Sequence, residues 1–405
     1  MYENEKLENG EEGATAPGAT RAVTRRRFLV LLGAAAGTVM AGAALPGCTG
    51  GSEADGGSDA PGEADSSAKT VTVTDFDGKE VVIPADAQHI GALLGNSYPQ
   101  VLFLGGASRT TYRFMTDTTW IDAICPDVEA YGIEYYKNAR EPNIEDLMQK
   151  GVDLVFYWGG LDDQVKKMND AGIPVVVSNP SVTDFKNQDD WRDLIEREIM
   201  LYADALGDEA VAKARDWLAY VDEKVAAVSA KTKSLSGSDV KRVYYIRKQD
   251  DGLQCFAASS YPKILVQIAG GTLVSGDVDT QGSGFTEVNM EQVIDWDPEY
   301  VFTGWLDSVD GILANEQWAP VTAIKNGEVH LTPCSLNTTF WDYGTEAPLD
   351  MLYIAKTIHP ELFSEIDMER EIKEFYQRFY NVKLTDEQAR FMLERKGPDG
   401  GPLTA

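Results

Sequence analysis

Two stretches of sixteen residues, EPNIEDLMQKGVDLVF at 141–156 and EVNMEQVIDWDPEYVF at 287–302, decide the fold of this chain. Each begins near a helix-capping asparagine, continues through a short amphipathic helix and a turn, and ends in an apolar strand. A helix that feeds a buried strand is half of a βαβ unit, and such units build parallel sheets. Because the capping residues Asn143 and Asn289 are 146 positions apart, the repeat predicts two similar α/β lobes, with a crevice between them for a ligand.

The N-terminus resembles an export signal of the lipoprotein type. The stretch TRRRFL at 24–29 precedes an apolar, glycine- and alanine-rich segment, and LPGC at 45–48 follows it. The arginines resemble a twin-arginine signal, and the residues ending at Cys48 resemble a lipobox, whose cysteine receives diacylglycerol. We therefore expect a signal over 1–47, and a lipidated Cys48 with a flexible, small and polar tether over 48–69. The alternative is an ordinary cleaved signal in which Cys48 occurs by chance.

Composition sets further bounds on the function. The formal net charge is −29, so the chain is repelled by phosphate backbones and nucleic acid is excluded as a partner. About 335 residues after the tether are too many for one usual core and suit two domains. Cys125, Cys255 and Cys334 are widely spaced and odd in number, which gives neither a disulfide framework nor a CxxC metal site. One disulfide or three buried thiols are both compatible with this pattern.

The first lobe is expected over residues 70–186. The alternating run at 71–84, centred on an Asp-Gly pair, predicts a β-hairpin. Apolar runs at 89–94, 152–158 and 173–177 predict buried strands. Helical patterns between these runs complete an α/β lobe.

A helical connector and a second lobe follow. Between 187 and 236 the apolar residues recur with a helical period, and Gly207 is placed to end one helix before a second of up to about 25 residues. A strand at 242–246 opens the C-terminal α/β lobe, which we expect over 237–395. A short tail over 396–405 ends the chain.

Four segments in this order resemble the extracytoplasmic substrate-binding proteins of ABC importers for iron–siderophore, haem and corrinoid. They lie at 73–84, 143–156, 318–329 and 355–363. The resemblance implies two Rossmann-like α/β lobes joined by a long rigid α-helix, with the ligand cleft between them. It also implies an ABC permease and its ATPase as partners. We expect a monomer outside the cytoplasm, tied to the cell membrane by its lipid anchor.

Two glutamates are candidates for contact with the permease. Glu145 and Glu291 fall at the second position of the repeated helices, where an acidic side chain complements the helix dipole. In the family that the chain resembles, matching glutamates dock with arginines on the permease, a pairing that is bidentate and directional. The resemblance therefore assigns docking to Glu145 and Glu291. Asp146 and Gln292 are each the third residue of their helix, the position whose side chain completes a capping box.

Loops at strand ends supply the candidates for ligand contact, because open α/β sheets bind ligands there. The candidates are Asn96, Tyr98, Tyr112, Arg113 and Trp158 in the first lobe, and Arg247, Tyr261, Phe285, Trp305 and Trp341 in the second. An aromatic residue at a strand end belongs more often to the core or the rim than to a ligand contact. Arg247 directly follows the expected strand in an acidic protein, so it could pair with an anionic chelate; the alternative is a salt bridge with Asp250 or Asp251. An aromatic-lined cleft suits flat or bulky chelates.

Enzymatic and direct metal-binding functions have little support in the sequence. His89, His330 and His359 are scattered, and no protease, hydrolase or P-loop motif is present. We therefore expect no catalytic residue, no cofactor and no metal held directly by side chains. Molybdate or tungstate is the alternative ligand, and it predicts serine, asparagine, backbone amides and arginine around a small pocket. A lipid-tethered sensor that serves no importer is the other alternative.

Overall fold

The computed structural model describes residues 69–114, 119–125, 128–179, 186–249, 252–280, 284–334, 336 and 344–403. Residues Ser67–Ala405 form one compact unit. The expected signal, Cys48, nearly all of the tether and Trp341 lie outside the described residues. None of the described helices combines the length and the hydropathy of a transmembrane span.

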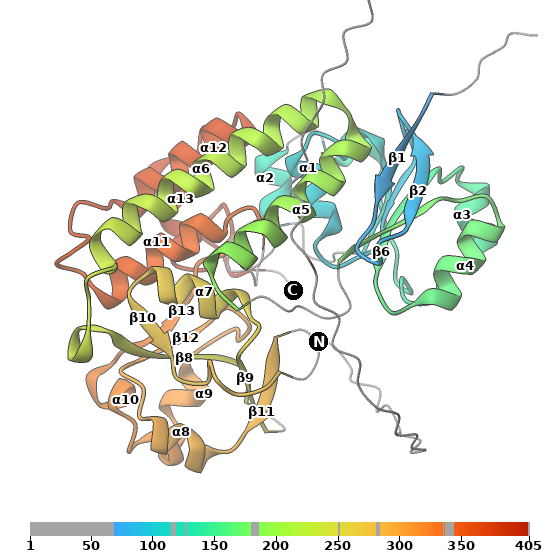
Figure 1. Ribbon diagram of the computed structural model, residues 1–405. Coiled ribbons are helices and arrows are strands. Elements are labelled where there is room, and N and C mark those ends of the chain that lie inside the picture. Colours follow the sequence, from blue (N-terminus) through green and yellow to red (C-terminus); the bar gives the residue numbers. More distant parts are fainter. Residues whose placement is uncertain are drawn as a thin grey trace, which may run out of the picture. The chain divides into compact units, whose positions relative to one another are not determined.

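The N-terminal lobe is an α/β layer preceded by the expected hairpin (Figure 1). Strands β1 (Thr70–Thr74) and β2 (Glu80–Pro84) pair antiparallel. Five parallel strands follow in the order β5-β4-β3-β6-β7, namely β3 (Ile90–Ala92), β4 (Thr110–Arg113), β5 (Glu134–Tyr135), β6 (Leu154–Trp158) and β7 (Val175–Asn179). Helices α1 (Ser97–Phe103), α2 (Thr119–Ile124), α3 (Ile144–Gln149) and α4 (Asp162–Asp170) connect them. The strand expected at 89–94 is shorter in the structure, where β3 covers only Ile90–Ala92 and His89 is exposed in front of it.

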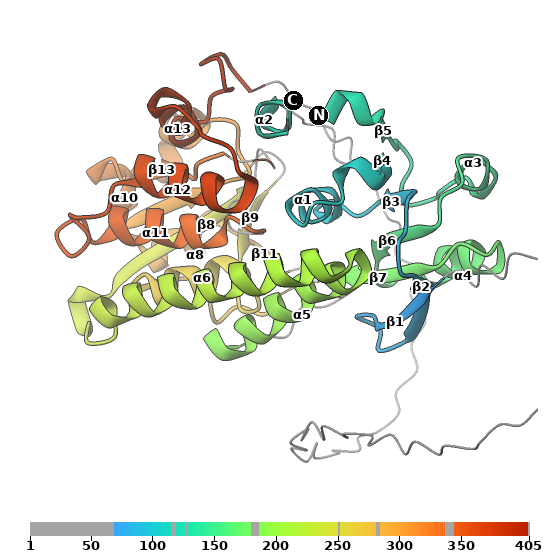
Figure 2. The same ribbon diagram turned by 90° about the horizontal axis from the view of Figure 1, so that it is seen from above.

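Two helices join the lobes, α5 (Gln188–Leu206) and α6 (Asp208–Thr232), and they lie side by side in Figure 2. Gly207 separates them with a φ of 102°, a backbone conformation that favours glycine. The expected second helix is confirmed, because α6 has 25 residues. Helix α5 is fastened to the first lobe, where Arg197 donates to the carbonyl oxygen of Asp75 over 2.7 Å.

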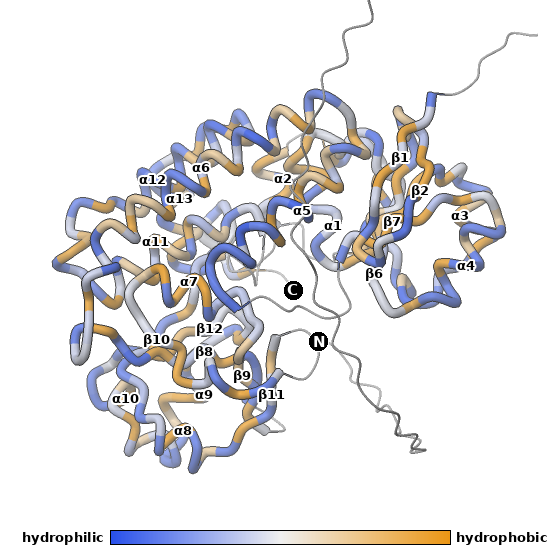
Figure 3. Tube along the Cα trace, in the orientation of Figure 1, coloured by the Kyte–Doolittle hydropathy of each residue, from blue (hydrophilic) through white to orange (hydrophobic). Residues whose placement is uncertain are grey.

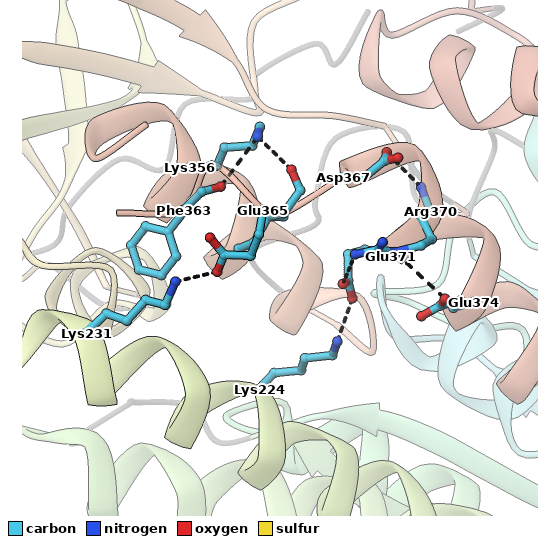
Figure 4. Close-up of polar contacts among 10 residues, drawn as sticks. Lys224, Lys231, Lys356, Phe363, Glu365, Asp367, Arg370, Glu371 and Glu374 are labelled. Carbon is cyan, nitrogen blue, oxygen red and sulfur yellow. Dashed lines mark hydrogen bonds and ion pairs between the residues drawn. The ribbon is translucent and has the colours of Figure 1, made fainter. Parts of the chain in front are cut away.

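Helix α6 is fastened to the C-terminal lobe instead (Figure 4). Nζ of Lys224 lies 2.5 Å from a carboxylate oxygen of Glu371, and both side chains are largely buried. Seven residues further along α6, Lys231 pairs with Glu365. Because α5 and α6 also pack against each other, this helix pair holds the two lobes together.

The C-terminal lobe has its own sheet, in the order β11-β9-β8-β12-β13, with β10 also paired to β8. Its strands are β8 (Lys241–Lys248), β9 (Leu253–Phe256), β10 (Gly271–Leu273), β11 (Phe285–Val288), β12 (Tyr300–Thr303) and β13 (Val329–Leu331). Strands β8, β10, β12 and β13 are parallel as expected, whereas β9 and β11 pair antiparallel. Only residues 249–252 connect β8 to β9, and so short a connection permits a hairpin but not a parallel crossover.

Helices cover this second sheet, and the buried residues of several of them belong to a hydrophobic core that also includes residues of the connector. They are α7 (Tyr261–Ile268), α8 (Met290–Trp296), α9 (Asp310–Leu313), α10 (Thr322–Asn326), α11 (Ala347–Ile358), α12 (Met368–Tyr380) and α13 (Asp386–Leu393). Hydrophilic and hydrophobic residues alternate along α6 and α12 in Figure 3, as amphipathic helices require. Their apolar faces join one continuous core with α1, α5 and α11. The two-lobe α/β fold expected from the repeat is confirmed.

Candidate functional site

Each sheet has a point at which its strand order reverses, and ligands of open α/β sheets bind there. In the first sheet, β3 is flanked by β4 on one side and β6 on the other; in the second, β8 is flanked by β10 and β12. Asn96 and Trp158 lie at or just beyond the carboxyl ends of β3 and β6. Arg247 and Trp305 hold the corresponding places at β8 and β12. Four of the candidate ligand residues therefore lie at the two reversal points.

Three candidates in the C-terminal lobe, Arg247, Phe285 and Trp305, form one cluster. The guanidinium carbon of Arg247 lies 4.1 Å from the ring centroid of Phe285 and 4.4 Å from that of Trp305. Both distances are within the range of a cation–π contact. Nη1 of Arg247 donates to the side-chain oxygen of Gln254 over 2.7 Å. The positive charge is thus held by two aromatic rings and a neutral amide.

One hydrogen-bond donor of the Arg247 guanidinium has no acceptor among the described residues. This donor is Nε, and Arg247 forms no ion pair among the residues that the structure describes. Burial lowers the pKa of this guanidinium, since few solvent molecules reach the charge. Arg247 is the next-to-last residue of β8, at its carboxyl end. The sequence predicts it directly after the strand, and this prediction is wrong because β8 continues to Lys248. Asp250 and Asp251, its alternative partners, lie outside the described residues.

The N-terminal lobe has a related cluster that the sequence analysis missed. The guanidinium carbon of Arg140 lies 5.0 Å from the ring centroid of Trp158, and Phe114 packs edge-on against the same ring at 5.2 Å. Arg140 is exposed and forms no ion pair with a described residue. Phe114 directly follows β4, and this strand-end position was the available signal. No sequence signal relates Arg140 to Trp158, because the connection between them is spatial.

Two other candidates of this lobe are held in its interior. Tyr98 is fully buried, and burial raises the pKa of its phenol. Tyr112 is also buried; its ring packs 4.8 Å from that of Tyr136, and its hydroxyl donates to Asp146 over 2.9 Å. Arg113 ends β4 and is partly buried. Of these three, only Arg113 has a side chain placed partly at the surface.

A cluster of three hydrogen-bonded side chains, one from each lobe and one from the connector, joins the lobes to the connector. Nδ2 of Asn96 donates to one carboxylate oxygen of Glu198 over 2.9 Å, and the hydroxyl of Tyr261 donates to the other over 3.3 Å. Glu198 belongs to α5, Asn96 precedes α1, and Tyr261 begins α7. Beside them is a cavity of about 20 Å³, enough for roughly one water molecule. Its lining comes from both lobes and the connector: Asn96, Gln100, Trp191, Ile195, Glu198, Ile199, Trp217, Val221, Tyr261, Gly344, Ala347 and Pro348.

Burial dominates the electrostatics of Glu198. Only 6% of the residue is exposed, and this burial raises the pKa of its carboxyl to about 7, against the opposing effect of the two hydrogen bonds. The sequence does not mark Glu198 as a site residue, because a glutamate in an amphipathic helix usually faces solvent. The available signal was its spacing, since it shares a helical face with Ile195 and Tyr202.

The two expected docking glutamates are both exposed on equivalent helices, α3 and α8. Asn289 and Gln292 form the expected reciprocal capping box at α8. At α3 the oxygen of Asn143 accepts from the backbone of Glu145, but the box is not reciprocal. The carboxylate of Asp146 accepts from Tyr112 instead.

The described part of the chain contains neither a cluster of possible metal ligands nor a disulfide. No three histidine, cysteine or acidic side chains there gather in a way that could hold a metal ion. Cys125, Cys255 and Cys334 form no disulfide with one another. Cys255 and Cys334 are buried, whereas Cys125 is only partly buried.

Comparison with known proteins relates this geometry to a family. The model of the family described as periplasmic binding protein matches residues 127–336. The chain is 26% identical over 257 residues to the molybdate-binding protein MolA of Haemophilus influenzae, which covers 61% of this chain and 72% of that protein. It is 26% identical over 198 residues to the iron(3+)-hydroxamate-binding protein FhuD of Bacillus subtilis, with 46% and 58% covered.

Solved structures show the same fold. A periplasmic solute-binding protein from Veillonella parvula superposes with a TM-score of 0.64 at 20% identity, covering 80% of this chain and 97% of that one. The structure of H. influenzae MolA bound to molybdate gives a TM-score of 0.64 at 22% identity, covering 78% and 99%. At these identities the likeness concerns the two-lobe architecture alone.

Proposed function

The chain belongs to the periplasmic binding protein family, and we propose that its ligand is an anionic metal chelate of the ferric siderophore, haem or corrinoid type. Membership makes it an extracytoplasmic solute-binding protein of an ABC importer and not an enzyme. Its partners are accordingly a small ligand and the permease and ATPase of that importer. The chemistry of the ligand is our proposal.

The Arg247 cluster is the observation on which this proposal rests. In a chain of net charge −29, a local positive charge favours the binding of an anion against the surrounding negative field. The guanidinium of Arg247 lies against the rings of Phe285 and Trp305, and its Nε is buried without a hydrogen-bond partner among the described residues, so a ligand oxygen that displaces its surroundings would supply the missing acceptor. The edge of a guanidinium matches carboxylate and phenolate groups of chelators. The adjacent rings offer apolar area to the chelate body.

The Arg140 cluster supports a ligand larger than a single oxyanion. Arg140 and Trp158 repeat, in the N-terminal lobe, the combination of a cation and an aromatic ring near strand ends. A chelate has several anionic groups around a bulky body and can use one such cluster from each lobe. Our preferred ligand contacts are therefore Arg247, Phe285, Trp305, Trp158 and Arg140.

Molybdate or tungstate remains the second candidate, favoured by the similarity to MolA over 72% of that protein's length. A small oxyanion would use the edge of Arg247 and nearby backbone amides. The buried carboxyl of Glu198 disfavours an anion close to Asn96. This candidate therefore places the ligand nearer to the C-terminal lobe.

Native mass spectrometry of the purified chain tests the choice of ligand. The panel consists of a ferric hydroxamate, a ferric catecholate, haem, cobalamin and molybdate, each added alone and in competition. We expect one of the chelates to be retained and to exclude the others. Retention of molybdate alone would overturn the chelate proposal and favour the oxyanion.

We propose further that Glu145 and Glu291 dock on the permease and that Cys48 carries a lipid anchor on a monomeric protein. Exchanging both glutamates for arginine (Glu145→Arg with Glu291→Arg) should abolish uptake and leave ligand affinity intact, because the pairs with permease arginines become repulsive. Lost ligand affinity would contradict the docking role. A ligand-loaded protein that fails to stimulate the ATPase of its importer would favour the sensor alternative.

A further inference from the structure

The two copies of the repeat place corresponding residues in corresponding environments. Asn143 and Asn289 cap α3 and α8, and their side chains accept backbone hydrogen bonds there. Four residues after each cap, Leu147 and Val293 are fully buried. Each short helix is therefore anchored to its lobe through the same position, which fixes the residues that face outward.

The residue after each anchor is large, apolar and exposed. The exposed fraction is 55% for Met148 and 37% for Ile294. A single exposed apolar side chain needs no explanation. These two, however, belong to only seven large apolar side chains that are exposed in the described part of the chain, and they occupy the same position of a repeat whose copies differ at most other positions.

Each of these apolar side chains lies beside one of the exposed glutamates. Met148 is three residues after Glu145, and Ile294 is three residues after Glu291, a spacing that puts both side chains on neighbouring parts of one helix surface. Neither glutamate forms an ion pair with a described residue. Capping is done by other side chains, so the two carboxylates are available for cationic groups from another molecule.

We propose that Met148 with Glu145, and Ile294 with Glu291, form two matched docking patches for the ABC permease. This inference rests on the proposed docking function and adds the apolar half of the contact. An exposed carboxylate gains little from a cation in water. Burying Met148 or Ile294 against the permease excludes water from the adjacent ion pair and strengthens it. The permease surface that fits carries, for each lobe, an arginine or lysine beside an apolar side chain.

Binding of the ligand-loaded chain to its importer in lipid nanodiscs tests the proposal. The test variant is Met148→Ser with Ile294→Ser, and the matched control is Leu313→Ser with Leu362→Ser, whose leucines are similarly exposed but lie outside the repeat. We expect the test variant to bind the importer about tenfold more weakly or worse, from the lost apolar burial at two sites. The control should bind as the parent chain does.

Two further measurements separate this proposal from the function on which it rests. Ligand affinity and thermal midpoint should be unchanged in the test variant, and a loss of either would overturn the proposal by showing a structural role. Unchanged importer binding in the test variant, together with lost binding after charge reversal of Glu145 and Glu291, would overturn only the apolar contribution. Unchanged binding after both sets of substitutions would overturn the apolar proposal and the docking role of the glutamates together.

Discussion

The carboxylate of Glu198 accepts a hydrogen bond from the side-chain amide of Asn96 over 2.9 Å. The hydroxyl of Tyr261 binds the second carboxylate oxygen. One buried side chain of the connector thus contacts both lobes at the small cavity between them. Burial raises the pKa of this carboxyl to about 7, so its protonation differs between the folded and the unfolded state.

The pH dependence of stability should change when Glu198 is replaced by glutamine. Folding raises the pKa of Glu198 from 4.5 to about 7, so the folded state holds this proton more tightly than the unfolded state. The stabilisation is fully present below pH 4.5 and is lost as the pH rises through about 7. Relative to Glu198→Gln, the parent chain should lose on the order of 2 kcal/mol of unfolding free energy between pH 5 and 8.

Urea unfolding of both chains across this pH range measures the difference. Glutamine keeps the size of the side chain, and Oδ1 of Asn96, which has no hydrogen-bond partner among the described residues, can accept from the new amide. Glu346 has a similarly raised pKa of about 7, but it is present in both chains and cancels. Parallel stability curves for the two chains would contradict the prediction.

Ligand affinity should depend on the geometry of Arg247 as well as its charge. Replacing Arg247 by alanine removes a charge-assisted hydrogen bond, so we expect chelate binding to weaken by about 10- to 100-fold. Arg247→Lys keeps the charge but loses the planar edge and the stacking on Phe285 and Trp305, so an intermediate affinity is expected.

Isothermal titration with the chelate retained in mass spectrometry provides the measurement. Arg192→Ala is the matched control, because Arg192 pairs with Asp222 and Glu196 on the connector surface. Equal affinities for the parent chain and its three variants, Arg247→Ala, Arg247→Lys and Arg192→Ala, would show that Arg247 does not contact the ligand.

Two glycines with the same backbone conformation should differ in their tolerance of alanine. Gly270 and Gly172 have φ angles of 88° and 83°, so alanine costs either position about 1 to 2 kcal/mol. A Cβ at Gly270 would also lie 2.7 Å from Leu235 and 2.9 Å from the ring of His359, whereas a Cβ at Gly172 meets nothing within 4 Å. Urea unfolding should show a clearly larger loss of stability for Gly270→Ala, and equal losses would show that the surroundings of Gly270 yield easily.

The two ion pairs that hold α6 to the C-terminal lobe should differ in their contribution to stability (Figure 4). Glu371→Ala leaves Lys224 largely buried without its carboxylate, which should cost on the order of 3 kcal/mol. Glu365→Ala breaks an exposed pair with Lys231 and should cost under about 1 kcal/mol. Thermal unfolding in low and high salt checks this, since only the exposed pair should be sensitive to screening. The reverse ranking would contradict the assignment of burial.

The elements that could be predicted from the sequence are those defined by local patterns. The duplicated cap, helix and strand predicted two lobes, and Gly207 predicted the boundary between α5 and α6. The antiparallel strands β9 and β11 were missed, because each has only four residues, and so short a run does not distinguish a strand from a loop by its periodicity. The burial of Tyr112 was also missed, since a tyrosine at a strand end can face either the core or the surface.

By itself, the sequence determined the lobes, the connector and the exposed glutamates of the repeat, because helical period, capping and strand length depend on residues close together in the chain. Only the tertiary structure decided how the candidate site is built. Arg247 meets Phe285 and Trp305, Arg140 meets Trp158, and Glu198 meets Asn96 and Tyr261. These partners are far apart in sequence, and both their contacts and the pKa of Glu198 depend on burial, which is fixed only when the sheets and helices pack.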